Sequence, residues 1–396
     1  MKWENKEHEF DDIVINYRNR FDNKDFFVFG TGIVATGYKG SYRYFGRLKG
    51  FVDNNKDKHG RCFLGKDILS FAEWLQKHKK DTFLLICVSG KNYEEIKLQL
   101  LQHGLLEGRD FIWHAKFVNE VFPVMMHYDN GGIFLPLVQI SLTERCTLKC
   151  KKCAHACYRV PNSVMDLSLE DACRSADTLF LFVDYVKEFV LIGGEPLLYK
   201  TLAKVIEYIG SKYRNKIDIF SITTNGTIIP NDEVLNLCKK YNVLFRISNY
   251  SKTLEWINDR HKKLVSKLEE RDIEYVLAPS DRMWKDYGFE YVDRKGSPQE
   301  LVDVFDRCKT PCHEIRGDKF YYCVMARSVS ENMGRNVGVD DCLDLSKLHP
   351  IRDKRLVFEY MMGYSDKGYL DMCNYCHGAD SEKYIIPVAE QIKDEQ

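Results

Sequence analysis

The first 130 residues alternate short apolar runs with amphipathic stretches. Apolar runs at 25–32, 48–55 and 81–90 are typical of buried strands, and residues 93–104 repeat their apolar positions at helical spacing. Strands that alternate with helices predict a parallel sheet with crossover helices. The turn-rich stretch at 128–136 predicts a linker, so we place a first domain at residues 1–128.

A second alternating series follows and predicts a larger α/β domain at residues 135–300. Its helices include one that opens with Ser168 and Asp171 in capping-box spacing. Five or more strand–helix units favour a barrel or partial barrel, with its chemistry at the carboxyl ends of the strands. The pattern stops near Asp306, and cysteines recur in the rest of the chain, so we expect a small cysteine-rich domain at 305–396. The predicted strands lie at 137–143, 189–196, 217–226, 243–250 and 274–280.

Composition narrows the class of protein. A chain of 396 residues is long enough for two or three domains, and 44% hydrophobic with 29% charged residues is typical of a globular protein. Lys+Arg and Asp+Glu balance at 58 each, which argues against nucleic-acid or membrane partners. No apolar run approaches the ~20 residues of a membrane helix, and the polar start is unlike a signal peptide. We therefore expect a cytoplasmic protein.

Fourteen cysteines in a long chain of this kind favour metal or redox chemistry over disulfides. Cys146, Cys150 and Cys153 follow the predicted strand at 137–143 with C-x3-C-x2-C spacing. Three thiolates can hold three corners of a cubane iron–sulfur cluster and leave the fourth iron open. A structural zinc site usually has four protein ligands. The spacing alone leaves a zinc site as an alternative.

Polar motifs end the next three predicted strands. Glycines in such a motif let the backbone approach a ligand closely, and a carboxylate accepts hydrogen bonds from an ammonium group. The motifs are "GGEP", "TTNGT" and "RISNY", and their candidate binding residues are Gly193, Gly194, Glu195, Pro196, Thr224, Asn225 and Ser248.

Together, the cysteine loop and these motifs resemble the radical SAM superfamily. The resemblance implies that Cys146, Cys150 and Cys153 hold a [4Fe–4S] cluster whose open iron is chelated by S-adenosylmethionine (SAM). It also implies that Glu195 meets the SAM ammonium, and that the polar residues at 224, 225 and 248 face its ribose or carboxylate. The family usually has an aromatic residue or histidine before the third cysteine. Here that residue is Lys152, whose aliphatic stem can still cover a ring.

A second group of cysteines resembles the twitch domain, the shortened form of the SPASM extension. The resemblance implies one auxiliary [4Fe–4S] cluster. Cys308 can replace Cys312 as its first ligand because the two are only four residues apart, and a four-cysteine zinc knuckle is the alternative. Cys342 is interpreted as a bystander. The expected ligands are Cys312, Cys323, Cys373 and Cys376.

The first domain carries a dinucleotide-type fingerprint. Gly30, Gly32 and Ala35 follow a strand in G-x-G-x-x-A spacing, and Asp53 ends the next strand, as in folds that place a phosphate at a helix N-terminus and an acid at a ribose. The same pattern also fits a turn that binds nothing. The segment resembles Rossmann-like domains attached to bacterial sugar and polysaccharide biosynthesis proteins. A nucleotide in this domain is therefore a hypothesis.

The radical SAM resemblance implies a reaction class. An electron, from a donor such as flavodoxin or ferredoxin, cleaves SAM, and the resulting radical removes a hydrogen atom from a sugar, cyclitol or nucleotide-linked metabolite. An auxiliary cluster would accept the remaining electron and give oxidation, whereas a thiol such as Cys308 would return a hydrogen atom and give epimerisation. Two alternatives stay open: modification of a ribosomally made peptide, and a non-catalytic zinc or iron–sulfur protein.

Overall fold

A computed structural model describes residues 15, 16, 19, 25–77, 82–160, 166–288, 293–308, 312–334 and 341–392. The chain divides into two compact units, one within Asn5–Pro136 and one within Leu137–Gln396. None of the helices in the described ranges has the length and apolar character of a membrane span.

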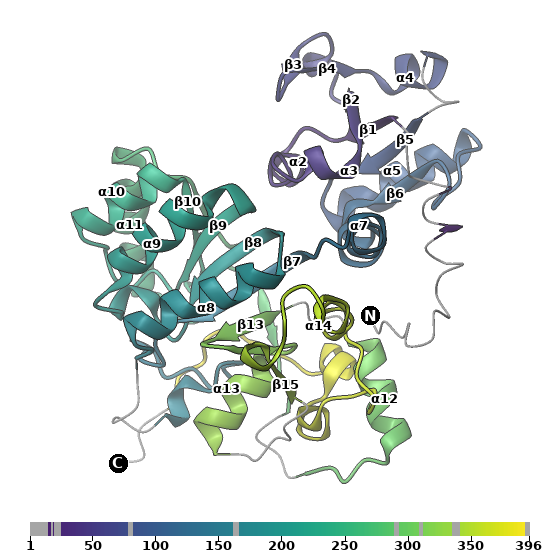
Figure 1. The fold of residues 1–396 in the computed structure, drawn as a ribbon. Helices are drawn as coiled ribbons and strands as arrows, with labels where there is room; N and C mark the ends of the chain where they lie inside the picture. Colours follow the sequence, from purple (N-terminus) through teal and green to yellow (C-terminus); the bar gives the residue numbers. More distant parts are fainter. Residues whose placement is uncertain are drawn as a thin grey trace. The chain divides into compact units, whose positions relative to one another are not determined.

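The first unit contains a six-stranded sheet in the order β3-β4-β2-β1-β5-β6 (Figure 1). The central strand β1 pairs in parallel with both β2 and β5, which confirms the predicted parallel sheet. Its fully buried side chains include Trp74, Leu100 and Phe111. The strands are β1 (Asp25–Phe29), β2 (Arg47–Val52), β3 (Cys62–Phe63), β4 (Lys66–Leu69), β5 (Thr82–Ile86) and β6 (Phe111–Trp113), and the main helices are α2 (Ile33–Thr36), α3 (Tyr42–Phe45), α4 (Phe71–Lys77), α5 (Gly90–Gln102) and α7 (Phe122–Asn130).

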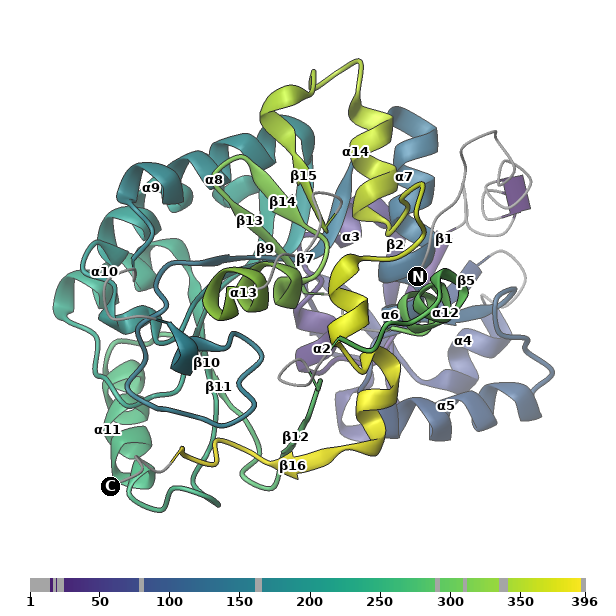
Figure 2. The same cartoon turned by 90° about the horizontal axis from the view of Figure 1, so that it is seen from below.

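The second unit contains an eight-stranded sheet in the order β11-β10-β9-β8-β7-β13-β14-β15. Strands β8 to β11 are mutually parallel, as the sequence predicts, and β13 is parallel to β7. Figure 2 shows β13, β14 and β15 continuing the sheet beyond β7. The strands are β7 (Phe134–Ser141), β8 (Tyr185–Ile192), β9 (Ile217–Thr224), β10 (Val243–Ile247), β11 (Tyr275–Leu277), β13 (His313–Arg316), β14 (Lys319–Tyr321) and β15 (Cys342–Asp344).

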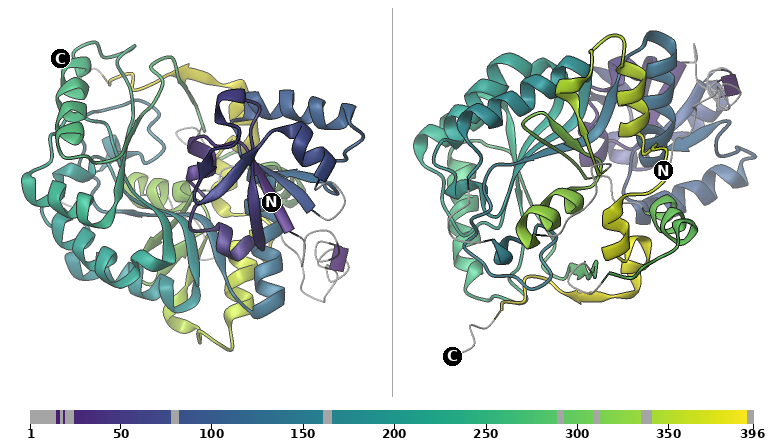
Figure 3. Two further views of the ribbon diagram at one scale, coloured as in Figure 1. Left: turned by 90° about the horizontal axis from the view of Figure 1, so that it is seen from above. Right: turned by 60° about the horizontal axis from the view of Figure 1, so that its bottom comes forward.

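Four helices cover the outer face of β8–β10 (Figure 3). Phe189, Phe220 and Phe245 are fully buried on these strands, and Phe180 of the first helix lies 6.0 Å from Phe189 between ring centroids. Because side chains alternate along a strand, the residues directly before and after each of these strand phenylalanines point to the inner face of the sheet. The four are α8 (Leu169–Phe182), α9 (Leu202–Tyr213), α10 (Asp232–Tyr241) and α11 (Ile257–Glu270); α12 (Pro298–Arg307), α13 (Val324–Met333) and α14 (Lys354–Met361) follow.

Two features differ from the prediction. Residues 128–136 are mostly the end of α7 and the start of β7, so only about three residues around Gly131 act as a connection. The cysteine-rich region also shares one compact unit with the barrel strands rather than standing apart. Its strands β13, β14 and β15 extend the edge of the sheet that the barrel strands form. A separate two-stranded sheet joins β12 (Met283–Lys285) to β16 (Ile385–Pro387).

Candidate active site

The three-cysteine loop begins just after β7. Cys146, Cys150 and Cys153 all pack around Leu148 and the fully buried Ala389, so the structure brings the predicted ligands together. Burial raises the pKa of both Cys146 and Cys150 to about 12. These two thiols are therefore neutral near pH 7 until a bound metal removes their protons.

The third thiol, Cys153, has a partner outside the three-cysteine motif. A hydrogen bond from Cys157 lowers the pKa of Cys153 to about 6. The Cys157 thiol is also 3.8 Å from Glu144 Oε2. Its position four residues after Cys153 was the only available sign, since a C-x3-C spacing recurs there.

Glu195 connects the motifs at the ends of β8 and β9. Its carboxylate accepts hydrogen bonds from Thr224 Oγ1 at 2.7 Å and from the backbone N–H of Asn225 at 2.8 Å. Asn225 Nδ2 in turn donates to Cys146 Sγ at 3.6 Å. Glu195 is fully buried, and burial raises its pKa to about 7. In this structure Glu195 holds the strand ends together, and its contact with a SAM ammonium stays a prediction.

The two glycines before Glu195 bring the backbone of β8 against the cysteine loop. A Cβ on Gly193 would overlap the backbone of Thr143, and one on Gly194 would overlap that of Arg145. The Gly194 N–H donates to Thr143 O at 2.7 Å. Glycine is therefore required for the close approach of two chain segments here. Ser248 is partly exposed, and its N–H donates to Thr224 O at 2.9 Å.

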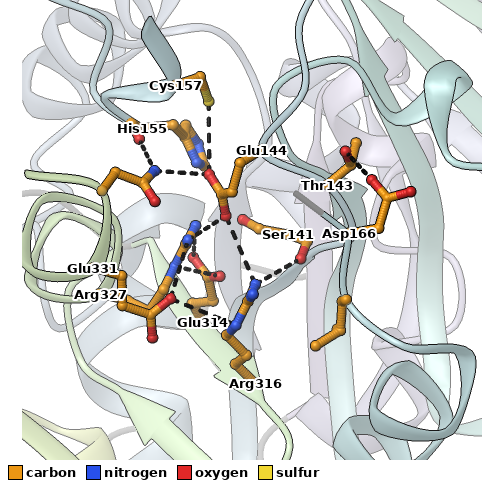
Figure 4. Close-up of polar contacts among 12 residues, drawn as sticks. Ser141, Thr143, Glu144, His155, Cys157, Asp166, Glu314, Arg316, Arg327 and Glu331 are labelled. Carbon is orange, nitrogen blue, oxygen red and sulfur yellow. Dashed lines mark hydrogen bonds and ion pairs between the residues drawn. The ribbon is translucent and has the colours of Figure 1, made fainter. Parts of the chain in front are cut away.

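A buried ion network lies behind the loop (Figure 4). Arg327 of α13 is fully buried between Glu144, with which it forms an ion pair, and Glu314 of β13, at 2.9 Å. Asn332 Nδ2 donates to Glu144 Oε2 at 2.8 Å and to His155 O at 2.7 Å. Helix α13 thus ties the cysteine loop to β13. No sequence motif marked these residues.

The charges in this network affect one another. Burial raises the pKa of Glu144, but the charge of Arg327, the Asn332 hydrogen bond and the charges of His155 and Arg316 together hold it below its usual range. Glu314 shares the same guanidinium and is more deeply enclosed, so burial raises its pKa. Removing Arg327 would therefore leave two buried carboxyls with only the more distant Arg316, 3.7 Å from Glu144, as a counter-charge.

The cysteines of the C-terminal region gather around one apolar core, which includes Phe305 and Met372. Cys323 is the N-cap residue of α13, and Cys373 and Cys376 lie in and directly after a short 3-10 helix. Burial raises the pKa of Cys323, Cys373 and Cys376.

Cys312 packs against the same core as Cys323, Cys373 and Cys376, so the structure brings the four predicted auxiliary ligands to one region. Burial raises the pKa of Cys312 to about 11. Cys342 is on β15, opposite Tyr321.

Polar side chains line the inner face of the sheet at β8, β9 and β10. The Glu188 carboxylate forms an ion pair with Arg246, at 2.5 Å from Nε, and accepts a hydrogen bond from Ser221 Oγ at 3.1 Å. The Glu188 side chain is 6% exposed and that of Arg246 is 41% exposed. One edge of the guanidinium is thus held by Glu188 while the side chain remains open to solvent.

Lys152, the departure from the family pattern, has a backbone φ of +58° and forms an ion pair with Asp286 at 3.3 Å. The aromatic side chains next to the loop are instead Tyr250 and Trp284, which pack against the cysteine cluster and lie 5.5 Å apart between ring centroids.

The fingerprint in the first unit is engaged by its own neighbours. Asp53 Oδ2 accepts hydrogen bonds from Thr31 Oγ1 at 2.5 Å and from Lys58 Nζ at 2.9 Å. Gly30 has a φ of +108°, and a Cβ there would lie 2.8 Å from Cys87 O, so this glycine is required by the turn. Gly32 has open space around its Cβ position, and α2 behind it has only four residues. Nucleotide binding stays a prediction.

The cysteine loop fits a thiolate-bound iron–sulfur cluster. Three thiols lie in one loop, and N–H donors from Asn225 and Gln391 already point at two of the sulfurs, a pattern that tunes such clusters. Among the described residues, no three ligating side chains meet at the spacing of a single bound metal ion. In a cubane each thiolate binds a different iron, so its ligands stand further apart.

Comparison with known proteins gives a match over the same residues. Residues 140–277 match the family model described as the Radical SAM superfamily. This range runs from the end of β7 to the end of β11 and contains the cysteine loop and all three strand-end motifs.

Similar proteins carry the name GTP 3′,8-cyclase. That of Campylobacter curvus is 32% identical over 289 residues, which is 66% of this chain and 82% of that protein. That of Campylobacter lari is 28% identical over 201 residues, or 49% of this chain and 58% of that protein. The chain spans only 32% of a Campylobacter jejuni relative that is 34% identical over 109 residues.

Solved structures give weaker likenesses. BtrN in complex with AdoMet and 2-DOIA is 15% identical, with a TM-score of 0.42 over 66% of this chain and 98% of that chain. SuiB of Streptococcus suis bound to S-adenosylmethionine is 18% identical, with a TM-score of 0.30 over 55% of this chain and 47% of that chain. The identity to the Campylobacter curvus protein over most of its length, and the family match across the cysteine loop, show that this chain belongs to the radical SAM superfamily.

Proposed function

We propose that this protein cleaves SAM reductively and removes a hydrogen atom from a sugar, cyclitol or nucleotide-linked metabolite. The observation that carries the proposal is the hydrogen-bonded chain from Glu195 through Asn225 to Cys146, which joins two strand-end motifs to the cysteine loop. A protein that only stored a metal ion would not need this connection. When bound, the [4Fe–4S] cluster and SAM of this family supply the one-electron chemistry.

The chain's own residues would bind the cluster and position SAM. Cys146, Cys150 and Cys153 would hold the cluster, and the buried Glu195 fixes the backbone at the strand ends where SAM would bind. A redox protein such as flavodoxin or ferredoxin would supply the electron.

The side chains on the inner face of the sheet support the proposal of a polar substrate. Arg246 offers a partly exposed cation, while Glu188 and Ser221 add a carboxylate and a hydroxyl at the same level. A guanidinium suits phosphate or carboxylate groups, and the other two suit hydroxyl groups. Relatives named GTP 3′,8-cyclase support a nucleotide-type substrate for this chain. The first unit remains a candidate for binding a nucleotide portion.

The C-terminal cysteines would hold one auxiliary [4Fe–4S] cluster. Cys312, Cys323, Cys373 and Cys376 all belong to or pack against the same apolar cluster, which supports these four as the ligands. Cys308, four residues before Cys312, then remains the candidate for a thiol that returns a hydrogen atom.

The test is anaerobic reconstitution followed by incubation with a reductant, SAM and one candidate substrate at a time: GTP, UDP-, GDP- and CDP-sugars, and free cyclitols. We expect 5′-deoxyadenosine even without substrate, and faster formation with the true one. Product mass separates oxidation, which loses two hydrogens, from epimerisation, which loses none. Absence of 5′-deoxyadenosine in a protein that contains iron and sulfide would overturn the proposal.

A further inference from the structure

The chain returns to the cysteine loop near residue 390. After β16, residues 388–392, here called the C-terminal strap, run antiparallel to residues 149–151, and Cys150 and Gln391 form a β-bridge. The Lys151 N–H donates to Glu390 O at 2.7 Å, and the Ile392 N–H donates to Lys149 O at 2.8 Å. Val388 is 2% exposed and Ala389 is fully buried. The strap is therefore part of the loop's packing rather than a loose tail.

Both ends of the Gln391 carboxamide are used. Its Oε1 accepts a hydrogen bond from the Lys149 N–H at 2.8 Å, so the oxygen must face Lys149. Its Nε2 consequently faces Cys150 and donates to the sulfur at 3.2 Å and to Ala389 O at 2.7 Å. The amide is fixed on three sides with one N–H aimed at a thiol that is itself only 7% exposed.

Each thiol of the loop accepts a hydrogen bond from a side chain that lies outside the three-cysteine motif. Asn225 serves Cys146, Cys157 serves Cys153, and Gln391 serves Cys150. Hydrogen bonds to cluster sulfurs and exclusion of solvent are two of the factors that set the reduction potential of an iron–sulfur cluster. The strap provides both at Cys150, through Gln391 and through the buried Val388 and Ala389.

We propose that Gln391 is a positioning residue for Cys150, and that the C-terminal strap sets the reduction potential of the loop's cluster and limits access of solvent to it. The inference rests on the proposed function in one respect, because it takes Cys146, Cys150 and Cys153 as cluster ligands. Neutral N–H donors stabilise the reduced, more negatively charged cluster. Losing one moves the potential downward.

The first experiment is a redox titration of the reconstituted full chain. The fraction of reduced cluster is measured from the EPR signal that changes on adding SAM. Gln391→Glu keeps an acceptor for the Lys149 N–H and removes the donor to sulfur, whereas Gln391→Met removes both. We expect both variants to lower the midpoint potential, with about tenfold less reduced cluster at a fixed potential for Gln391→Glu, which is about 59 mV for one electron. Glu390→Gln, which removes only the exposed ion pair with Lys151, should match the wild type.

A second measurement does not depend on a cluster. Hydrogen–deuterium exchange of the apoprotein should show faster exchange at Lys149 in Gln391→Met, but not in Gln391→Glu, and faster exchange at Lys151 when residues 390–396 are deleted. In a separate measurement on the reconstituted chain, iron release to a chelator should be several-fold faster in the deletion variant.

The outcomes separate the two proposals. If the wild type has no SAM-sensitive EPR signal and Cys150→Ala loses no iron, the proposed function fails. If that signal is present but both Gln391 variants titrate and release iron as the wild type does, the role of the strap is wrong.

Discussion

Two acids at strand ends, one in each unit, follow the same local pattern and behave differently. Asp53 directly follows β2 near the glycines after β1, and Glu195 follows two glycines after β8. Asp53 is held by Thr31, which lies after the neighbouring strand β1, and by Lys58, and its side chain remains 12% exposed. Glu195 is fully buried and is held by residues of the next strand's motif. A glycine–acid pattern therefore marks a contact between neighbouring strand ends in both units, but only the structure shows how deeply each acid is buried.

The electrostatics of the two acids differ in the same way. Partial burial would raise the pKa of Asp53, but hydrogen bonds from Thr31 and Asn55 and the charge of Lys58 hold it below its usual range. Burial of Glu195 has no cation to offset it, and the pKa rises to about 7. Burial thus destabilises the charged form of Glu195, the acid near the cysteine loop, and such shifts are typical of functional sites.

The largest effect should come from the cysteine loop itself. Cys150→Ala should abolish 5′-deoxyadenosine formation and reduce bound iron by about four atoms per chain, one cubane's worth. Cys62→Ala is the matched control, because Cys62 is an exposed cysteine of the first unit. Equal loss of iron in both variants, measured by colorimetric assay, would contradict the assignment of the loop.

The next largest effect should come from the buried ion network around Arg327, which joins distant segments of the second unit. Arg327→Met leaves Glu144 and Glu314 buried with only the more distant Arg316 as a counter-charge, so we expect a loss of about 3–5 kcal/mol in urea unfolding. Arg352→Met removes an exposed pair with Asp353, and its effect should stay within about 0.5 kcal/mol. Similar values for the two variants would show that burial of the network contributes little.

The comparison of the two acids can be tested directly by substituting each of them. Glu195→Ala leaves Thr224 Oγ1 and the Asn225 N–H buried without an acceptor, which should cost about 1–3 kcal/mol in unfolding free energy and weaken SAM binding. Asp53→Ala should cost about 1 kcal/mol or less, because its partner Lys58 is 37% exposed and water can replace the carboxylate. If Asp53→Ala proves the more costly, the distinction between a partly exposed and a fully buried acid is wrong.

The smallest effect concerns the glycines of the first unit. Gly30→Ala should lower the free energy of unfolding by about 1 kcal/mol or more, since it forces a side chain into a left-handed conformation, whereas Gly32→Ala should be close to neutral. A thermal-shift screen with NAD, NADP and UDP-, GDP- and CDP-sugars then tests ligand binding. We expect any shift to vanish in Gly32→Val. No shift in the wild type would mean that the fingerprint is only a turn.

Much of the sheet could be predicted from sequence because buried parallel strands are continuous apolar runs. β1, β2, β5 and β7–β10 all lie within or next to the apolar runs, and Ser168 caps α8 as the capping-box spacing indicates. The cysteine loop was also readable, because its three thiols are close together in sequence.

What could not be predicted depends on contacts between distant residues. β13 joins β7 rather than β11, which no local pattern specifies. Arg327 meets Glu144 across 183 positions, and Gln391 meets Cys150 across 241. The choice between Cys308 and Cys312 likewise depends on how α12 delivers the chain to the core, because spacing allows both.

The strap also gives the molecule an order of assembly during synthesis. At about 5–20 residues per second, Gln391 leaves the ribosome roughly 10–50 s after Cys150, which lies 241 positions earlier. Throughout that interval the loop has neither the amide donor at Cys150 nor the buried cover of Val388 and Ala389. If the strap limits access as proposed, iron and sulfide reach the cysteines more readily while translation is still under way than after residue 391 has been made.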